Sequence, residues 1–323
     1  MDLIYMNSQR QDVGVMKDYT LDLAFGADEN DIECKVTRSN HCCEVGFYLY
    51  LEGTEYGGII DSIGVDTAVG VITYSGRTWH GILESKVVEP DPGEDYLTVS
   101  GEANTVLASL VSRIGLGALF TTSTVASGIN VSRYKMNRYI GGYEGIRKML
   151  KASGAKLQIA FKDGMVELSA VPLVDYSQDE QFDTDQIDFS IKKNSCPINH
   201  VVCLGKGELK EREVIHLYAD KNGTVSHTQS ITGLSEVTAV YDYPNAESSE
   251  ELEQGGVDLL AEAWNSDEIH VNFSASDASY DIGDVVGAVE LVTGVSVRSE
   301  ITKKIVSIDK GNITISYEMG DKS

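Results

Sequence analysis

Basic residues are scarce in this chain of 323 residues. The 26 lysines and arginines stand against 50 aspartates and glutamates, which gives a formal net charge of −24 at pH 7. A surface of that average charge repels phosphate backbones and anionic lipid headgroups. We therefore expect no direct nucleic-acid recognition and no stable membrane insertion.

Long apolar runs are also missing. Residues 1–10 contain a four-residue apolar run without the basic flank of a secretory signal. No segment reaches the roughly 20 apolar residues that a membrane-spanning helix needs. The expected product is soluble and intracellular, and its 42% of hydrophobic residues is enough for a sizeable core.

Cysteine is too rare, and odd in number, for a disulfide framework. The five cysteines are Cys34, Cys42, Cys43, Cys196 and Cys203. The best metal pattern is Cys196, His200 and Cys203, which lacks a fourth nearby ligand and a second Cys-x-x-Cys. We therefore expect reduced thiols on strands and no metal site.

The sequence also lacks a group of residues at the spacing of a known catalytic motif. His80 beside Trp79 could be a base in a cleft, but a histidine at a strand edge needs no catalytic reason. Residues 281–284, Asp-Ile-Gly-Asp, could suggest calcium, yet they lack the third acidic position and the distal glutamate of an EF-hand loop. No phosphate loop, dinucleotide fingerprint or nucleophile elbow occurs. We expect no catalytic, cofactor-binding or metal residues and no enzyme activity.

The amino-terminal part alternates apolar and polar residues in short runs, which predicts strands from Tyr19 to Val88. Within it, residues 74–88 read Tyr-Ser-Gly-Arg-Thr-Trp-His-Gly-Ile-Leu-Glu-Ser-Lys-Val-Val. They predict a strand, a glycine bend and a second strand, closed by Pro90 and Pro92. A small antiparallel barrel or sandwich is the expected product.

After Pro92 the apolar residues recur at helical spacing. The expected elements are a helix at 103–114, a surface loop at 116–129, a helix at 143–153, a hairpin of 157–161 with 165–171, and an acidic linker at 178–188. Gly115 and Gly154 stand where the two helices should end. Asp163-Gly164 favours a tight hairpin turn, because both residues tolerate positive φ.

The carboxyl-terminal part returns to strands around one helix. The expected strands are 200–205, 213–219, 269–275, 284–292 and 301–317. Ser248 and Glu251 fit a capping box at the start of the helix, which should run to Trp264. Residues 309–312, Asp-Lys-Gly-Asn, should turn a final hairpin.

These patterns predict four segments and a mainly β (α+β) fold. The segments are an N-terminal β-barrel domain (1–92), a helical insertion (93–155), a β-hairpin with an acidic linker (156–188), and a C-terminal β-barrel domain (189–323) with an inserted helix at 248–265.

An ordered set of motifs resembles the XkdQ/YqbQ-like family of phage tail hub proteins. It consists of Gly76-Arg-Thr-Trp-His-Gly-Ile-Leu83 with Lys86-Val-Val88, Gly142-Tyr-Glu-Gly-Ile-Arg-Lys-Met-Leu-Lys-Ala-Ser-Gly154, the helix before Trp264, Ile282-Gly-Asp-Val285, and a terminal repeat ending at Gly320. The resemblance covers essentially the whole chain. It implies two antiparallel β-barrel domains of tail-hub type with small helical and mixed α/β insertions.

The resemblance also implies a function in assembly. The expected protein is a baseplate hub of a phage tail or tail-like bacteriocin, made in the host bacterial cytoplasm, whose homotrimeric ring joins a sixfold tail tube to a threefold central spike. Its partners would be the tube or tube-initiator protein and the spike, with the tape measure and baseplate wedge proteins as further candidates. Because the chain ends shortly after its last hairpin, we expect no cell-wall hydrolase.

A carbohydrate-binding or carbohydrate-active β-protein acting on the cell envelope is the alternative. It is favoured by the strand content and by tyrosine and tryptophan residues expected to be exposed, although the excess of tyrosine, 16 residues against two tryptophans, is also typical of assembly interfaces. Trp79 and Trp264 discriminate between the two hypotheses, because a sugar platform needs exposed aromatic rings, whereas we expect the first in a strand and the second on the core face of a helix.

Overall fold

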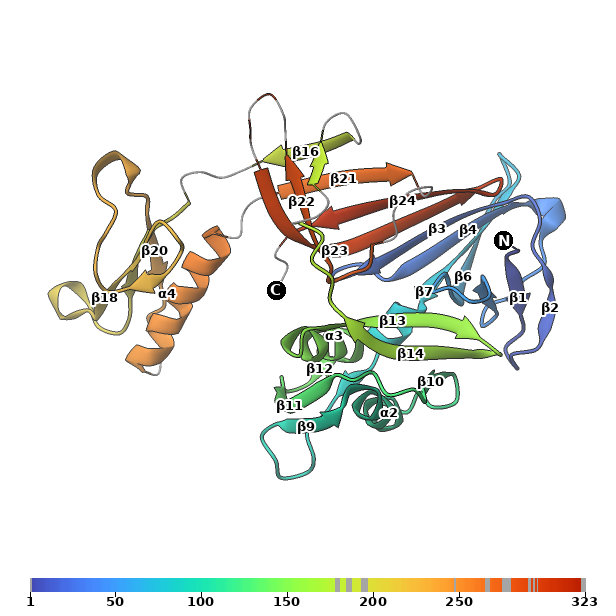
Figure 1. Cartoon of the computed structure of the whole chain (residues 1–323), viewed down its shortest axis with the longest axis horizontal. Coiled ribbons are helices and arrows are strands. Elements are labelled where there is room, and N and C mark those ends of the chain that lie inside the picture. Colours follow the sequence, from blue (N-terminus) through green and yellow to red (C-terminus); the bar gives the residue numbers. More distant parts are fainter. Residues whose placement is uncertain are drawn as a thin grey trace. The chain divides into compact units, whose positions relative to one another are not determined.

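The computed structural model describes residues 2–177, 181–183, 188–192, 197–246, 248–264, 268–274, 280–289, 292, 294 and 296–320. The chain divides into two compact units (Figure 1). Unit 1 consists of Met1–Phe189, His270–Leu291 and Arg298–Lys322, and unit 2 of Ser190–Ile269, Val292–Val297 and Ser323.

A large antiparallel sheet forms the frame of unit 1. Its strands, in spatial order, are β24 (Asn312–Met319), β23 (Ser296–Asp309), β3 (Tyr19–Gly26), β4 (Asp31–Thr37), β7 (Val71–Thr78), β6 (Gly57–Asp66), β5 (Tyr48–Tyr50), β1 (Ile4–Met6) and β2 (Asp12–Val15). Leu21 and Leu23 of β3 are buried while Asp22 between them is exposed, as expected for a strand with one face in the core. The mainly β fold class is confirmed.

The carboxyl-terminal hairpin belongs to this same sheet. β23 and β24 turn at Asp309–Asn312, as the sequence predicts, and β23 then pairs with β3, so that Ile308 lies opposite Leu21. Strands from the two ends of the chain therefore build one sheet, where two separate barrels were expected. Among the described strands no closed barrel is detected, because the path ends at β2 without returning.

Four further strands extend the sheet at this hairpin. Two of them, β21 (Glu268–Ser274) and β16 (Asp188–Lys192), lie beyond β24, and two, β22 (Val285–Val289) and β15 (Gln181–Asp183), are attached at β23. β15 and β22 pair in parallel, and β22 also pairs with β23. Most of the predicted acidic linker, 178–188, lies outside the described residues.

The segment 74–88 differs from its prediction. β7 ends at Thr78, and a short helix, α1 (Trp79–Glu84), replaces the expected bend and second strand; only β8 (Val87–Val88) remains of that strand. The helix begins here because the Thr78 side chain accepts a hydrogen bond from the Gly81 amide at 3.3 Å, which satisfies a free N–H of the first turn.

The Gly-Arg signature within that segment has a packing explanation. A Cβ on Gly76 would lie 1.9 Å from the carbonyl oxygen of Ile59, where β6 carries a register shift. The Arg77 guanidinium donates from Nε and Nη2 to the two carboxylate oxygens of Asp61, both at 2.8 Å. The signature therefore holds β7 against the irregular part of β6.

The insertion of unit 1 contains two helices and three small sheets. Its elements are β9 (Leu97–Glu102), α2 (Ala103–Arg113), β10 (Phe120–Thr122), β11 (Asn130–Met136), β12 (Ile140–Gly141), α3 (Gly142–Ala152), β13 (Ala155–Lys162) and β14 (Met165–Pro172). Both predicted helices are confirmed, and Gly115 and Gly154 follow them with φ of 74° and 70°. The predicted hairpin is confirmed as β13–β14. The loop predicted at 116–129 is wrong in part, because β10 lies within it and pairs with β14.

α1, the two helices and the β13–β14 hairpin share one apolar core. Trp79, Phe120 and Phe161 are at most 2% exposed within it. The Trp79 and Phe161 rings stack at 5.5 Å. Burying side chains of this size contributes on the order of 2–3 kcal/mol each, so this core attaches the insertion to the end of β7.

Unit 2 is a small sheet packed on one helix. Its elements are β17 (His200–Leu204), β18 (Val214–Ala219), β19 (Val225–Ser226), β20 (Thr238–Asp242) and α4 (Ser249–Trp264). Val201 and Cys203 alternate toward the helix and meet Leu252 and Leu260. The predicted helix is confirmed, and Ser248 caps it by accepting from the Glu251 amide at 3.2 Å.

Three 3-10 helices complete the described structure: η1 (Arg38–Asn40), η2 (Leu209–Glu211) and η3 (Gly233–Ser235). In the part of the chain described here, no helix is long and apolar enough to cross a membrane.

Candidate functional site

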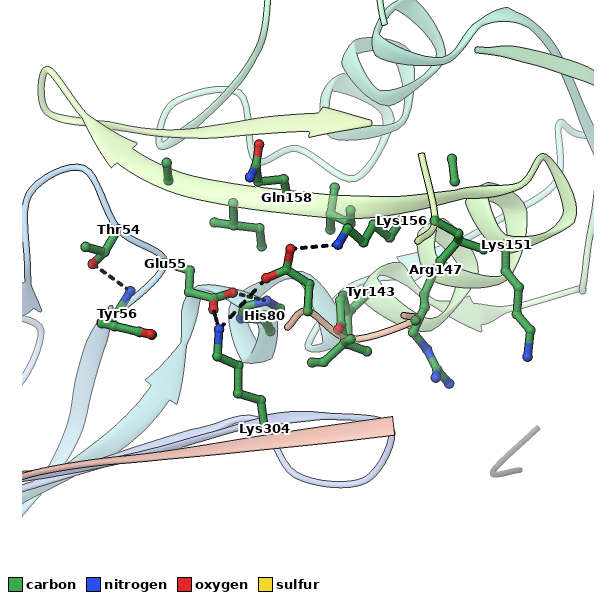
Figure 2. A pocket seen from close by; sticks show the side chains of 18 of the residues that line it. Thr54, Glu55, Tyr56, His80, Tyr143, Arg147, Lys151, Lys156, Gln158 and Lys304 are labelled. Atoms are coloured by element: carbon green, nitrogen blue, oxygen red, sulfur yellow. Dashed lines mark hydrogen bonds and ion pairs between the residues drawn. The ribbon is translucent and has the colours of Figure 1, made fainter. Parts of the chain in front are cut away.

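A cavity of about 370 Å³ lies in unit 1, where the insertion meets the large sheet. Its wall comes from the turn between β5 and β6, from α1, α3 and β13, from the turn before β22, and from β23 (Figure 2). These segments are far apart in the sequence, so the cavity exists only in the folded chain.

Two buried lysines line the cavity from opposite sides (Figure 2). Lys304 on β23 has only 4% of its side chain exposed and bonds to the Glu55 carboxylate at 2.6 Å. Lys156 on β13 has 8% exposed and bonds to Asp281 at 2.8 Å and to Asp284 at 2.7 Å. Asp281 also lies 3.9 Å from Lys304, so the five residues form one ion-pair network.

Local geometry directs the two lysines of β23. Successive strand residues face opposite sides, so Lys303 reaches Glu29 and Glu318 while Lys304 reaches Glu55. A register shift between Ile301 and Lys303 lies next to them.

The turn 281–284 presents its two carboxylates to Lys156. Gly283 has a φ of 101°, and the Asp284 amide donates to the Asp281 carbonyl at 3.1 Å. Asp284, with no exposed surface, also accepts from the amides of Val174 and Asp281 at 3.0 Å each. Lysine and amide hydrogens thus occupy the oxygens considered for calcium, and residues 281–284 form a turn before β22.

The electrostatics keep both lysines charged. Burial by itself lowers the pKa of Lys304, but Glu55 and two tyrosine oxygens outweigh it and the pKa is raised. For Lys156 burial also lowers the pKa, and hydrogen bonds to Asp281 and Asp284 again raise it. Removing one partner would leave a buried charge uncompensated, which typically costs about 3–5 kcal/mol.

His80 lies beside this network on α1. Its Nε2 is 3.7 Å from a Glu55 oxygen, and its ring packs against Phe25 and Tyr143. Burial lowers the pKa of His80 to about 4, and Glu55 only partly opposes that shift. At neutral pH the contact is therefore a neutral imidazole beside a carboxylate. Its Nδ1 is buried and has no hydrogen-bond partner among the described residues.

The arrangement is suited to holding segments together. The carboxylates of the network are engaged by lysines, and both lysines retain their protons, so they supply neither a free base nor an amine nucleophile at neutral pH. The network instead joins β13 of the insertion to β23 of the sheet through Asp281.

The other residues singled out in the sequence are not brought together here. Trp79 has no exposed surface, and Trp264 lies in unit 2 on the cluster that packs β17 against α4. The predicted core position of Trp264 is confirmed, whereas Trp79 lies in a helix and not in a strand. The two rings form no shared exposed platform, because Trp79 is inaccessible.

The considered metal pattern is described only for His200 and Cys203. Cys196 lies outside the described residues. His200 bonds through Nδ1 to Glu236 at 2.8 Å and through Nε2 to His216 at 2.9 Å. Cys203 is buried against α4, close to Gly256. No metal-binding group occurs among the residues that the structure describes.

Sequence reasoning missed the ion-pair network. The one available signal was Lys303-Lys304 directly before the apolar pair Ile305-Val306 of a predicted strand, since lysine at a buried strand position needs a partner. Glu55 and Asp284 could not be identified as partners, because nothing local connects them to Lys304 or Lys156.

Comparisons with known proteins concern the whole fold. No protein-family model matches the sequence, and no curated protein is significantly similar to it. Solved structures do match over nearly the full length. The alignment with a tail protein from Neisseria meningitidis MC58 covers 99% of this chain and 96% of the tail protein. The sequence identity is 10% and the TM-score is 0.54.

Two further structures agree. The 43 kDa tail protein of prophage MuSo2 from Shewanella oneidensis matches 99% of this chain and 98% of its own, at 10% identity and a TM-score of 0.57. A chain in the activated phage P2 baseplate matches 100% of both chains at 12% identity and a TM-score of 0.50. The protein therefore has the fold of phage tail and baseplate proteins.

Proposed function

We propose that this protein is a structural component of a phage tail or phage-tail-like particle and acts as the baseplate hub. The observation that carries the proposal is the match of this chain, end to end, to tail proteins of similar length. The internal charge network agrees with it, because its residues tie segments together and offer no free nucleophile. On this proposal the protein is not an enzyme.

The finer assignment is a homotrimeric ring between a sixfold tail tube and a threefold spike. It is supported by the ordered sequence motifs and by the tail fold. The proposed partners are a second and third copy of the chain, the tube or tube-initiator protein and the spike, with the tape measure and wedge proteins as further candidates. In the particle, the chain would lie on the tail axis.

Imaging of particles tests the location. Tail particles would be purified from the producing bacterium by density-gradient sedimentation, and an affinity tag on this chain would be labelled with gold. We expect one cluster of label at the tail tip and, after deletion of the gene, tubes without a baseplate. Absence of the chain from purified particles, or label spread along the tube, would contradict the proposal.

Mass measurement in solution tests the ring separately. Three copies of the 35.1 kDa chain give about 105 kDa. Light scattering over a range of concentrations, with and without the spike protein, should show that species. A strict monomer under both conditions refutes the ring and leaves the tail location to the imaging experiment.

A further inference from the structure

Arg147 lines the cavity and has no carboxylate partner among the described residues. Of the other basic residues in the wall, Lys156 and Lys304 belong to the network, Lys151 bonds to Glu300 at 2.6 Å, and Lys162 bonds to Glu167 at 2.8 Å. Among the described residues no carboxylate lies within ion-pair distance of Arg147. Its Nε is buried and has no hydrogen-bond partner there.

Nearby charges do not satisfy this guanidinium. Glu84 is close enough for Arg147 to influence its pKa, yet its carboxylate accepts from the Glu144 amide at 2.8 Å, at the start of α3. Lys148, the next residue on α3, pairs with Glu144 at 2.8 Å and does not line the cavity. Of the basic residues in the wall, Arg147 is therefore the one whose charge has no carboxylate partner in the described part of the chain.

The surroundings of Arg147 favour a small ligand. Tyr143, one helical turn earlier, is 4% exposed and lines the same cavity, as do Lys151 and His80. Figure 2 shows Arg147 and Lys151 extending in the same direction from α3. A buried guanidinium nitrogen without a partner is costly, and its planar donors match phosphate and carboxylate oxygens in pairs. The volume of about 370 Å³ accommodates such an anion.

We propose that this cavity binds a small oxyanion, a phosphate or a carboxylate, with Arg147 as its principal ligand. The guanidinium donates two hydrogen bonds to the anion, and the Tyr143 hydroxyl and the Lys151 ammonium lie in the same wall as additional donors. The inference does not depend on the proposed function, since it concerns only the wall of a cavity within unit 1.

Titration of the purified full-length chain in a chloride buffer tests the proposal. The probes are inorganic phosphate in one series and citrate in another, and the readouts are calorimetry and the Arg147 Nε–H signal in a ¹H–¹⁵N spectrum. We expect saturable binding of at least one anion that shifts this signal and weakens with added salt. The better probe identifies the source of the oxyanion.

Variants locate the binding. Arg147→Gln should weaken it by at least about tenfold, because it removes a charge-assisted, two-pronged contact. Arg147→Lys keeps the positive charge but loses the paired donors of the guanidinium. Its affinity for the anion should lie between those of the wild type and Arg147→Gln. Lys148→Gln is the matched control on the same helix and should bind like the wild type.

Two results would overturn the proposal. One is the absence of saturable binding of both anions to the wild type, and the other is equal binding by Arg147→Gln and the wild type. If Arg147→Gln does not fold, the Nε–H signal in the wild type decides, because an anion held elsewhere leaves it unshifted.

Discussion

Burial of His80 predicts a specific acid sensitivity of unit 1. The imidazole is neutral in the folded protein because burial lowers its pKa from 6.5 to about 4. In the unfolded chain it takes up a proton at higher pH, so the unfolded state binds more protons between those two values. The stability that this group contributes is therefore present above about pH 6.5 and is lost as pH falls toward 4.

The magnitude follows from the two pKa values. At about pH 5, protonation of this histidine in the unfolded chain raises the ratio of unfolded to folded protein by a factor of roughly 30. This lowers the free energy of unfolding by about 2 kcal/mol. His80→Phe keeps a ring between Phe25 and Tyr143 and cannot titrate. When the pH is lowered from about 7.5 to about 5, the wild type should lose about 2 kcal/mol more of its free energy of unfolding than the His80→Phe variant loses.

Urea unfolding followed by tryptophan fluorescence measures this difference. Trp79 is adjacent to His80 and fully buried, and Trp264→Phe makes it the only tryptophan in the chain. His41→Gln is the matched control, since it removes an exposed histidine from the same unit. The reasoning is refuted if His80→Phe loses as much stability on acidification as the wild type and the control.

Three further predictions concern the contribution of single side chains to stability. Lys304→Met should lower the free energy of unfolding by about 3–5 kcal/mol, because it leaves the mostly buried Glu55 carboxylate without its lysine partner. Adding Glu55→Gln should recover part of the loss in the same urea assay. Gly76→Ala should cost more than about 3 kcal/mol, since its Cβ would meet the Ile59 carbonyl, whereas Gly117→Ala has no atom within 4 Å and should change stability by less than about 0.5 kcal/mol. Ser248→Ala should cost about 1 kcal/mol in the unfolding of unit 2, measured with Trp264 as the reporter, and an unchanged midpoint would contradict its role as a cap.

Local patterns predicted the helices and tight hairpins well. The helices at 103–114 and 143–153 follow from apolar spacing with a terminal glycine, and the hairpin at Asp163-Gly164 follows from turn chemistry. These signals act over a few residues, so they need no knowledge of distant segments.

The segment 74–88 shows where local patterns fail. Its apolar residues at 79, 82 and 83 suit a helical turn as well as a strand. The Thr78 cap favours the helix. Glycine at position 81 allows it, because a Cβ there would lie 2.2 Å from the Asn30 carbonyl oxygen. Tertiary packing decided between two conformations that the sequence allows.

By itself, the sequence determined the mainly β class, the helices with their caps, the final hairpin and the resemblance to tail hub proteins. Only the tertiary structure decided that β23 pairs with β3, and that Lys304, Glu55, Asp281 and Lys156 meet beside a cavity. Strand pairing and ion pairing join residues up to about 290 positions apart, as for Thr20 and Asp309. Their selection depends on burial and register across the whole sheet, which no short window of sequence contains.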